Sequence, residues 1–351
     1  MSRRTTASLL LAALPAGLLA GLLACGCAAA PPRPPRALVA AGTDTLFLHE
    51  GDLLAQVHEG GGLGTRLLRR VAGSCAQAVA GRPTDVALDE QGRILVADGD
   101  LSQVLRLGAA GCTPKPYEVF KDPAFATPTG VEAFPAGIAV ADAGRAKVFL
   151  LREGSGSLAG ELKAPQGWLR PGQMHWDGNR LYVTDAGRHV VEIFDGGGVW
   201  QRTLGGPGAA PGQFLHPTAV CTDPDGGLWV LDALNHRVQQ FSAEGEPLFS
   251  FGVYDRAPGG FMFPKGLAFD EDGNLYVSDA GVNRIQVFSR GGALLYWFGD
   301  TGRGDGQFLL PSALCCRGNR LYIADQYNRR VEVYRYLPYL PLDRSLAGAK
   351  P

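Results

Sequence analysis

The sequence carries almost no surplus of charge. Its formal net charge is -1 over 351 residues, and its lysines and arginines form no stripe or block. Proteins that bind nucleic acids contact the phosphates through clustered basic side chains. We therefore expect no nucleic-acid partner.

Local motifs of catalysis and metal binding are also missing. The sequence has no Gly-x-Ser-x-Gly nucleophile elbow, no phosphate-binding P-loop and no Cys-x-x-Cys pair. It has only six histidines, and they do not cluster. These absences exclude enzyme classes that a short motif identifies, but not a metal site built from residues distant in sequence. We expect no cofactor, with a divalent metal as the alternative.

The N-terminal region predicts export. Arg3 and Arg4 precede an apolar run over residues 9–24, which is short for a membrane span and typical of a secretory signal. Residues 22–25 read Leu-Leu-Ala-Cys and resemble a bacterial lipobox. We therefore expect removal of a signal peptide, residues 1–24, and lipidation of Cys25. The alternative is an ordinary signal peptide and a secreted product.

Under the lipobox interpretation, the protein is a periplasm-facing lipoprotein of a bacterial envelope that contacts the membrane only through its lipid. Residues 25–36 then form the lipidated cysteine and a proline-rich tether. Gly26, in place of an aspartate, favours the outer membrane under the enteric sorting rule. Export also permits disulfides. Cys75 and Cys112 end candidate outer strands of successive repeats and are a candidate pair, whereas the adjacent Cys315 and Cys316 fit either a vicinal bridge or free thiols.

One pattern recurs six times: a strand-like segment that ends in aspartate. Successive aspartates are 43 to 47 residues apart. A fixed period in the forties with strand-type residues predicts a β-propeller, in which each repeat forms one blade. Because every repeat carries it, we interpret the aspartate as a structural corner that accepts backbone N–H groups. The six corner residues are Asp98, Asp142, Asp185, Asp232, Asp279 and Asp325.

The fullest copy, residues 264–299, contains four strand-like segments joined by turn residues, which predicts an all-β meander. Its corner reads Asp279-Ala-Gly-Val-Asn-Arg-Ile285, and the linker Gly-Gln-Phe-x-x-Pro occurs at residues 212–217 and 306–311. In these features the chain resembles the NHL repeat family, most clearly over residues 170–336. The resemblance implies a propeller of about six blades. Such propellers usually bind proteins, glycans or nucleic acids, and enzymes are a minority among them.

We expect a single propeller over residues 37–338, with six or seven four-stranded blades, and a tail over residues 339–351. Residues 36–73 keep the strand spacing of a worn seventh copy but carry His49 and Glu50 at the corner. The last repeat lacks a fourth strand, which an N-terminal strand could supply to close the ring. Seven units use the residues more fully, so seven is slightly favoured.

Histidines and tryptophans supply the candidate ligand-binding residues. His175 and His216 lie near the starts of first strands, which line the channel of a propeller, and with His49 they could hold a ligand or a metal. Peptide-amidating lyases, which have a related propeller, place zinc-binding histidines around the channel. Gluconolactonase-like hydrolases use a Glu, an Asn and an Asp around one ion, in sequence patterns that this chain lacks. Trp168 and Trp176 break the repeat and are candidate ligand-facing aromatics, with packing as the alternative.

These observations favour a binding or scaffold module over an enzyme. We expect a monomer that recognises a protein or peptide partner in the cell envelope through loops on one face, without catalysis. The alternative is a metal-dependent lyase or hydrolase with its site at the channel. Three or more histidine, acidic or asparagine side chains that converge on the channel mouth at metal-ligand distances would favour that enzyme.

Overall fold

The computed structural model describes residues 37–39, 46–52, 81–108, 117–120, 125–304 and 306–337. Over these residues the protein is all-β, apart from the short 3-10 helix η1 (Ala233–Asn235). The described part of the chain contains no helix long and apolar enough to cross a membrane. Cys25, Cys75 and Cys112 lie outside the described residues, so lipidation and the disulfide stay predictions.

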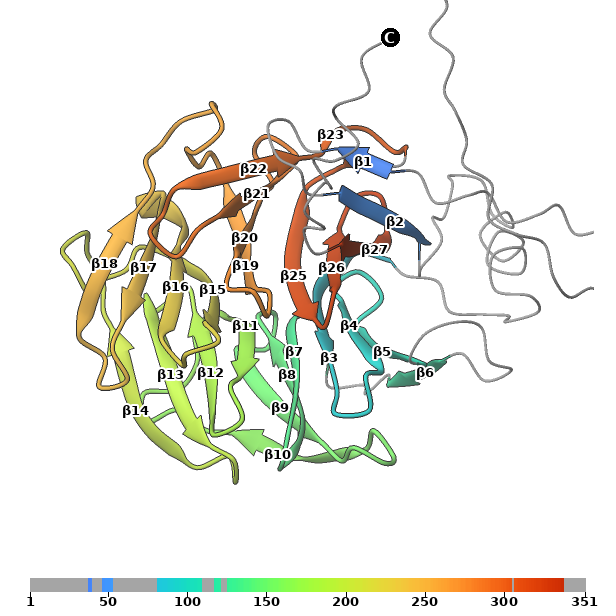
Figure 1. Cartoon of the computed structure of the whole chain (residues 1–351). Coiled ribbons are helices and arrows are strands. Elements are labelled where there is room, and N and C mark those ends of the chain that lie inside the picture. The colour runs from blue at the N-terminus through green and yellow to red at the C-terminus, as the bar shows by residue number, and fades with distance from the viewer. Residues whose placement is uncertain are drawn as a thin grey trace, which may run out of the picture. The chain divides into compact units, whose positions relative to one another are not determined.

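Six antiparallel sheets stand around a central axis as the blades of a propeller (Figure 1). Blade 1 comprises β3 (Pro83–Leu88), β4 (Ile94–Asp98), β5 (Gln103–Leu107) and β6 (Tyr117–Phe120). Blade 2 comprises β7 (Pro128–Phe134), β8 (Gly137–Asp142), β9 (Lys147–Leu151) and β10 (Leu158–Leu162). Blade 3 comprises β11 (Pro171–Trp176), β12 (Arg180–Asp185), β13 (Val190–Asp195) and β14 (Trp200–Gly205).

Blade 4 comprises β15 (Pro217–Thr222), β16 (Leu228–Asp232), β17 (Arg237–Phe241) and β18 (Pro247–Phe251). Blade 5 comprises β19 (Pro264–Phe269), β20 (Leu275–Asp279), β21 (Arg284–Phe288) and β22 (Leu294–Phe298). The short strands β23 (Asp300–Thr301) and β24 (Gln307–Phe308) pair in the linker that follows. Blade 6 comprises β25 (Pro311–Arg317), β26 (Arg320–Asp325), β27 (Arg330–Leu337), β2 (Leu46–Asp52) and, at its edge, β1 (Ala37–Val39).

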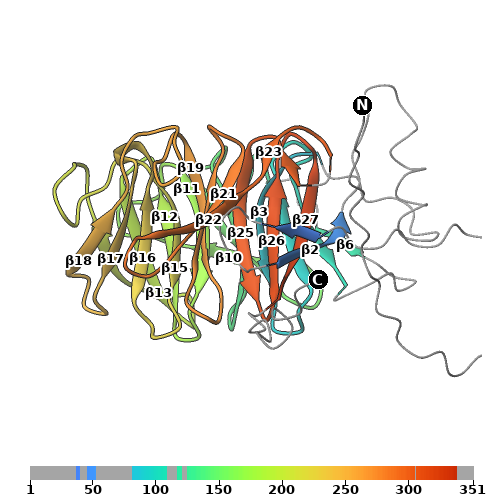
Figure 2. The ribbon, with the colours of Figure 1, turned by 45° about the horizontal axis from the view of Figure 1, so that its top comes forward.

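The first strand of each blade lies nearest the axis. These strands contact one another in the order β3, β7, β11, β15, β19, β25 and back to β3. Figure 2 shows the strands running between the two faces of the ring. Each blade therefore begins at the axis, and the start of every first strand faces the same end of the central channel.

Blade 6 is assembled from both ends of the described chain. Strand β2 pairs antiparallel with β27 and supplies the fourth strand that the last repeat lacks. The structure therefore has six blades, the smaller of the two numbers considered, because residues 46–52 complete blade 6 instead of joining a seventh unit. His49 pairs with Tyr334 in this fourth strand from the axis. The prediction that His49 lies at the channel was therefore wrong.

The core lies between the blades. The second strands are almost wholly buried because blades cover both of their faces. The linkers before blades 4 and 5 each add one buried phenylalanine: Phe214 packs on Phe241, and Phe261 packs on Phe288. Burial of such large side chains is the main favourable contribution to folding.

The corner aspartates hold the segment that leads into each first strand. All six are fully buried, and each accepts backbone N–H groups from residues just before the proline of its own blade. The two carboxylate oxygens of Asp185, for example, accept the N–H groups of Leu169 and Arg170 at 2.8 Å each. A carboxylate with several N–H donors fixes the local backbone firmly. The residues beside the prolines are thereby placed at one mouth of the channel.

Candidate ligand-binding site at the mouth of the channel

A pocket of about 290 Å³ opens at this mouth. All six blades contribute to its wall through residues that flank the proline of the first strand. The lining residues before the prolines are Arg82, Thr127, Arg170, His216 and Phe263, and those after them are Thr84, Thr129, Gly172, Thr218, Lys265 and Ser312. The repeated fold sets the shape of the pocket, and residues that differ between blades set its chemistry.

Three basic side chains converge on the pocket from alternate blades: Arg82 from blade 1, Arg170 from blade 3 and Lys265 from blade 5. Arg82 Nε lies 3.1 Å from Asp100 Oδ1. Lys265 Nζ donates to Gln326 Oε1 at 3.2 Å, a neutral partner. The side chain of Arg170 makes no hydrogen bond or ion pair with any described residue. Two of the three cations therefore have no acidic partner within the described structure.

The cations influence one another. Burial, followed by the charges of Arg82 and Arg170, lowers the pKa of Lys265. Burial, followed by Arg170 and His189, lowers the pKa of His216, so this imidazole is mainly neutral at pH 7. No aspartate or glutamate of the described chain lines the pocket. A concave site lined by charge of one sign concentrates counter-ions, so this mouth attracts anions.

Below the mouth, the Gln173 side chain crosses the channel, and the cavity beneath it has a different character. Gln173 lines both cavities, and its Nε2 donates across the channel to the carbonyl oxygen of Lys265 at 3.2 Å. The inner cavity has a volume of about 90 Å³, and Asp85, Glu132 and His175 line it. The two carboxyl groups connect neighbouring first strands: the two oxygens of Asp85 accept from Val86 N and from Val131 N of the next blade, each at 2.9 Å.

Burial keeps these inner groups close to neutrality. It raises the pKa of Asp85 to about 7, and burial together with the neighbouring Asp85 raises the pKa of Glu132 well above its usual range. Burial likewise lowers the pKa of His175 to about 4, despite the opposing effect of Asp177. In the described residues, no three histidine, cysteine or acidic side chains are arranged to hold a metal. The metal-dependent alternative therefore stays a prediction without a located site.

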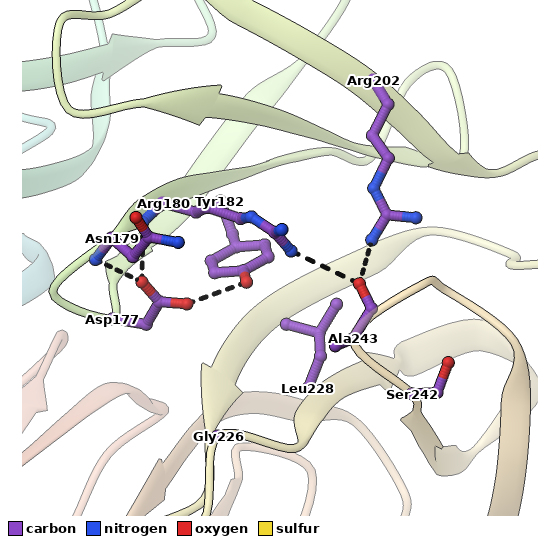
Figure 3. A pocket seen from close by; sticks show the side chains of 9 residues that line it. All are labelled: Asp177, Asn179, Arg180, Tyr182, Arg202, Gly226, Leu228, Ser242 and Ala243. Atoms are coloured by element: carbon purple, nitrogen blue, oxygen red, sulfur yellow. Dashed lines mark hydrogen bonds between the residues drawn. The ribbon is translucent and has the colours of Figure 1, made fainter.

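A third cavity, of about 200 Å³, lies between blades 3 and 4 at the opposite end of the strands. Figure 3 shows Arg180 and Arg202 pointing toward one carbonyl oxygen, that of Ala243, to which they donate at 3.3 and 2.8 Å. Asp177 lies beside them and accepts from the Tyr182 hydroxyl at 2.9 Å. Both arginines of this cavity are thus bound to the fold itself.

The candidate residues from the sequence occupy different places. His216 lines the mouth. His175 lines the inner cavity and shares a 2.9 Å hydrogen bond with Thr222 Oγ1. The two tryptophans pack between blades 2 and 3: Trp168 stacks on Phe194 and donates to the Leu162 carbonyl at 2.9 Å, and Trp176 packs on Phe134. Neither tryptophan lines the mouth.

The adjacent histidine His189 has a structural task. Its Nδ1 accepts the N–H of His216 at 3.0 Å. Two blades further on, Asn283 Oδ1 accepts the N–H of Leu310 at 2.8 Å in the same way. Both acceptors have a positive φ, four residues after a corner aspartate. The three described cysteines, Cys221, Cys315 and Cys316, are free thiols.

Sequence reasoning missed Arg82, Arg170 and Lys265, the residues that give the mouth its charge. Each is an ordinary charged residue in its local sequence, without a motif. An alignment of the six repeats on the proline of the first strand would have found them, because all three then fall one residue before or after it. The signal is positional and appears only when the blades are placed in a ring.

Comparison with known proteins agrees with this architecture. The family model of the NHL repeat matches residues 214–241 and 261–288. No curated protein matches the sequence. A solved gluconolactonase from Xanthomonas campestris is 17% identical, with 88% of this chain and 96% of that chain covered and a TM-score of 0.59. A virginiamycin B lyase from Staphylococcus aureus is 12% identical, with 87% and 95% covered and a TM-score of 0.55.

An auxiliary nutrient binding protein from Bacteroides thetaiotaomicron is 13% identical, with 83% of this chain and 77% of that chain covered and a TM-score of 0.58. At such identities the likeness concerns the fold alone. The protein is a six-bladed β-propeller. Two segments of its chain, in blades 4 and 5, match the NHL repeat model.

Proposed function

We propose that this propeller is a binding module of the cell envelope, and that it recognises a protein or peptide partner through the face that carries the mouth. The mouth receives an anionic group of that partner. The observation that carries the proposal is the convergence of Arg82, Arg170 and Lys265 on one pocket without a lining carboxylate. Like charges repel, so the fold gains nothing from this arrangement, whereas an anionic ligand would be attracted by all three.

Exposed apolar side chains around the mouth support a macromolecular partner. One of them lines the pocket itself and the other four are direct sequence neighbours of lining residues, and between 37% and 60% of their surface is exposed. Apolar and aromatic side chains around a polar centre are typical of protein-binding surfaces. This mouth rim comprises Leu169, Leu215, Leu234, Phe263 and Tyr327.

The remaining parts of the proposal come from the sequence. The lipobox-like segment before Cys25 supports a lipid anchor as the sole membrane contact, in an envelope protein that faces the periplasm. The near-neutral composition supports a partner other than nucleic acid. We propose a monomer without a cofactor, because a rigid propeller face can bind by itself and no step of recognition requires covalent chemistry.

Binding of acidic peptides tests the proposal. The full chain is titrated with fluorescent peptides of equal length that are acidic, neutral or basic, and binding is followed by anisotropy. We expect saturable binding of acidic peptides only, and a loss of at least about tenfold in Arg170→Gln and in Lys265→Gln, since each change removes one charged contact. Arg290→Gln is the matched control, because Arg290 pairs with the exposed Asp225 away from the mouth.

Two results would contradict the proposal. Equal binding of all three peptides would show that charge does not determine recognition. Unchanged binding in both mouth variants would place the acidic site elsewhere.

A further inference from the structure

We infer that the mouth is built for a dicarboxylate, and that this group is the C-terminal aspartate or glutamate of a partner chain. Such a residue carries two carboxylates, one on its side chain and one on its backbone. This inference rests on the proposed function and specifies the group that is recognised.

The charge balance matches two negative charges. Arg82 has an acidic neighbour in Asp100, whereas Arg170 and Lys265 have none among the described residues. The two cations without acidic partners come from blades 3 and 5, on different sides of the pocket. A single carboxylate would leave one of them unneutralised. A ligand with two separate carboxylates can contact both, and Arg is well suited to hold a carboxylate through paired N–H groups.

The closed floor favours a chain end. Ligand pockets commonly measure roughly 300–1,000 Å³, so a volume of about 290 Å³ is at the small end. Gln173 crosses the channel beneath it through its hydrogen bond to the Lys265 carbonyl. This side chain lies in the path of a chain that would pass deeper, whereas a terminal residue can enter the pocket above it with both of its carboxylates.

One hydroxyl group in the wall is left for a ligand. Thr84 and Thr129, which follow the prolines of blades 1 and 2, donate to the carbonyl oxygens of Pro128 and Pro171 at 2.8 Å each. Thr218 occupies the same position in blade 4, yet its Oγ1 is buried and has no hydrogen-bond partner in the described structure. Buried hydroxyl groups are rarely left unsatisfied, so each exception asks for a partner. Thr218 lines the pocket, so a rotation of its side chain would offer this hydrogen bond to a carboxylate oxygen there.

The mouth rim decides between a chain end and a free dicarboxylate. A small acid would fill the pocket and leave the rim side chains in water. A peptide whose last residue enters the pocket brings its preceding residues onto Leu169, Leu215 and Phe263, which are 60%, 37% and 45% exposed. Their burial adds affinity that a free acid cannot obtain. The geometry therefore favours a protein or peptide terminus.

Four acetylated hexapeptides that differ only at the last residue test this inference. They end in glutamate with a free carboxylate, glutamate amide, glutamine with a free carboxylate, and glutamine amide, and their affinities for the full chain are measured by titration calorimetry, with glutarate as the free dicarboxylate. We expect the first peptide to bind most tightly and each single loss of a carboxylate to weaken binding at least about tenfold, a step of 1.4 kcal/mol. Thr218→Val should weaken it severalfold, and Arg290→Gln should not change it.

Each other outcome has a distinct meaning. If the glutamate amide binds as tightly as the free acid, an acidic side chain is recognised without the terminus, which overturns the inference and leaves the proposed function intact. If glutarate binds as tightly as the best peptide, the source is a free dicarboxylate, and the chain-end inference fails. If neither glutarate nor any peptide binds, the proposed function fails as well.

Discussion

The mouth of the channel and the cavity between blades 3 and 4 both present basic side chains to a hollow, but in opposite ways. In the cavity, Arg180 and Arg202 donate to the carbonyl oxygen of Ala243, so the turn of blade 4 is tied to blade 3. At the mouth, the guanidinium group of Arg170 donates to no described group. Basic residues of the first kind stabilise the fold through hydrogen bonds, whereas those of the second kind form no such contact with it.

Blade 6 shows the first kind in its strongest form. Arg330 is 3% exposed in its side chain, lies 3.1 Å from Asp325 Oδ2 and pairs with Glu332, and both acids are fully buried. It also donates to the carbonyl oxygen of Gln307 at 2.7 Å, which fastens the linker before blade 6. Removal of such a residue leaves buried carboxylates without a partner. Removal of Arg170 leaves nothing unsatisfied, since it has no partner to lose.

The largest expected effect therefore distinguishes Arg330 from Arg170. Arg330→Met should lower the free energy of unfolding by about 3–5 kcal/mol, because two buried acids lose their cation. Arg170→Met should change it by no more than about 0.5 kcal/mol, as for other surface substitutions. Urea denaturation followed by tryptophan fluorescence measures both. A comparable loss in Arg170→Met would mean that Arg170 stabilises the fold as Arg330 does, which would contradict the distinction between them.

A second contrast runs along the channel, from the cationic mouth to the carboxyl groups below it. The pKa of Asp85 is about 7 in the fold against an ordinary 3.8, so the folded protein holds more protons than the unfolded chain between these values. Stability must then fall as pH rises through this window. Between pH 5 and pH 8 the loss is on the order of 2 kcal/mol.

Asp85→Asn isolates this contribution, because asparagine cannot ionise. We expect the unfolding free energy of the wild type to fall relative to that of the variant as pH rises from 5 to 8. Urea denaturation at each pH measures both. Arg290→Gln, at an exposed ion pair, is the matched control and should not alter this pH dependence, because arginine does not titrate between pH 5 and pH 8. If the unfolding free energies of wild type and variant change equally with pH, Asp85 titrates normally, and the inner cavity is better solvated than its burial indicates.

The same contrast explains what could be predicted from the sequence. The corner aspartates and the linker phenylalanines recur with the blades, and repetition identifies the fold because every blade needs the same corner and the same packing. The mouth depends on positions where the repeats differ, such as Arg82, Thr127 and Arg170 before successive prolines. These residues form one site only because the blades bring them together around the axis. The closure of blade 6 by β2 joins residues nearly 290 positions apart, as in the pair Phe47 and Tyr336. The missing fourth strand of the last repeat indicates this closure, but the strand spacing of residues 36–73 also fits a seventh unit, so the sequence leaves the number of blades open.

The smallest expected effect tests the comparison from the other side. Arg202→Gln removes two hydrogen bonds to the turn of blade 4, to the carbonyl oxygens of Ala243 and Glu244. Because the site is partly exposed, we expect a loss of only about 0.5–1 kcal/mol in unfolding free energy, together with unchanged affinity for acidic peptides. Arg170→Gln should do the reverse, with unchanged stability and weaker binding. The two variants are compared in one denaturation series and one anisotropy series. If Arg202→Gln weakens peptide binding as much as Arg170→Gln does, the cavity between blades 3 and 4 also receives the partner, and a basic residue bound to the fold can serve recognition as well as one that is free.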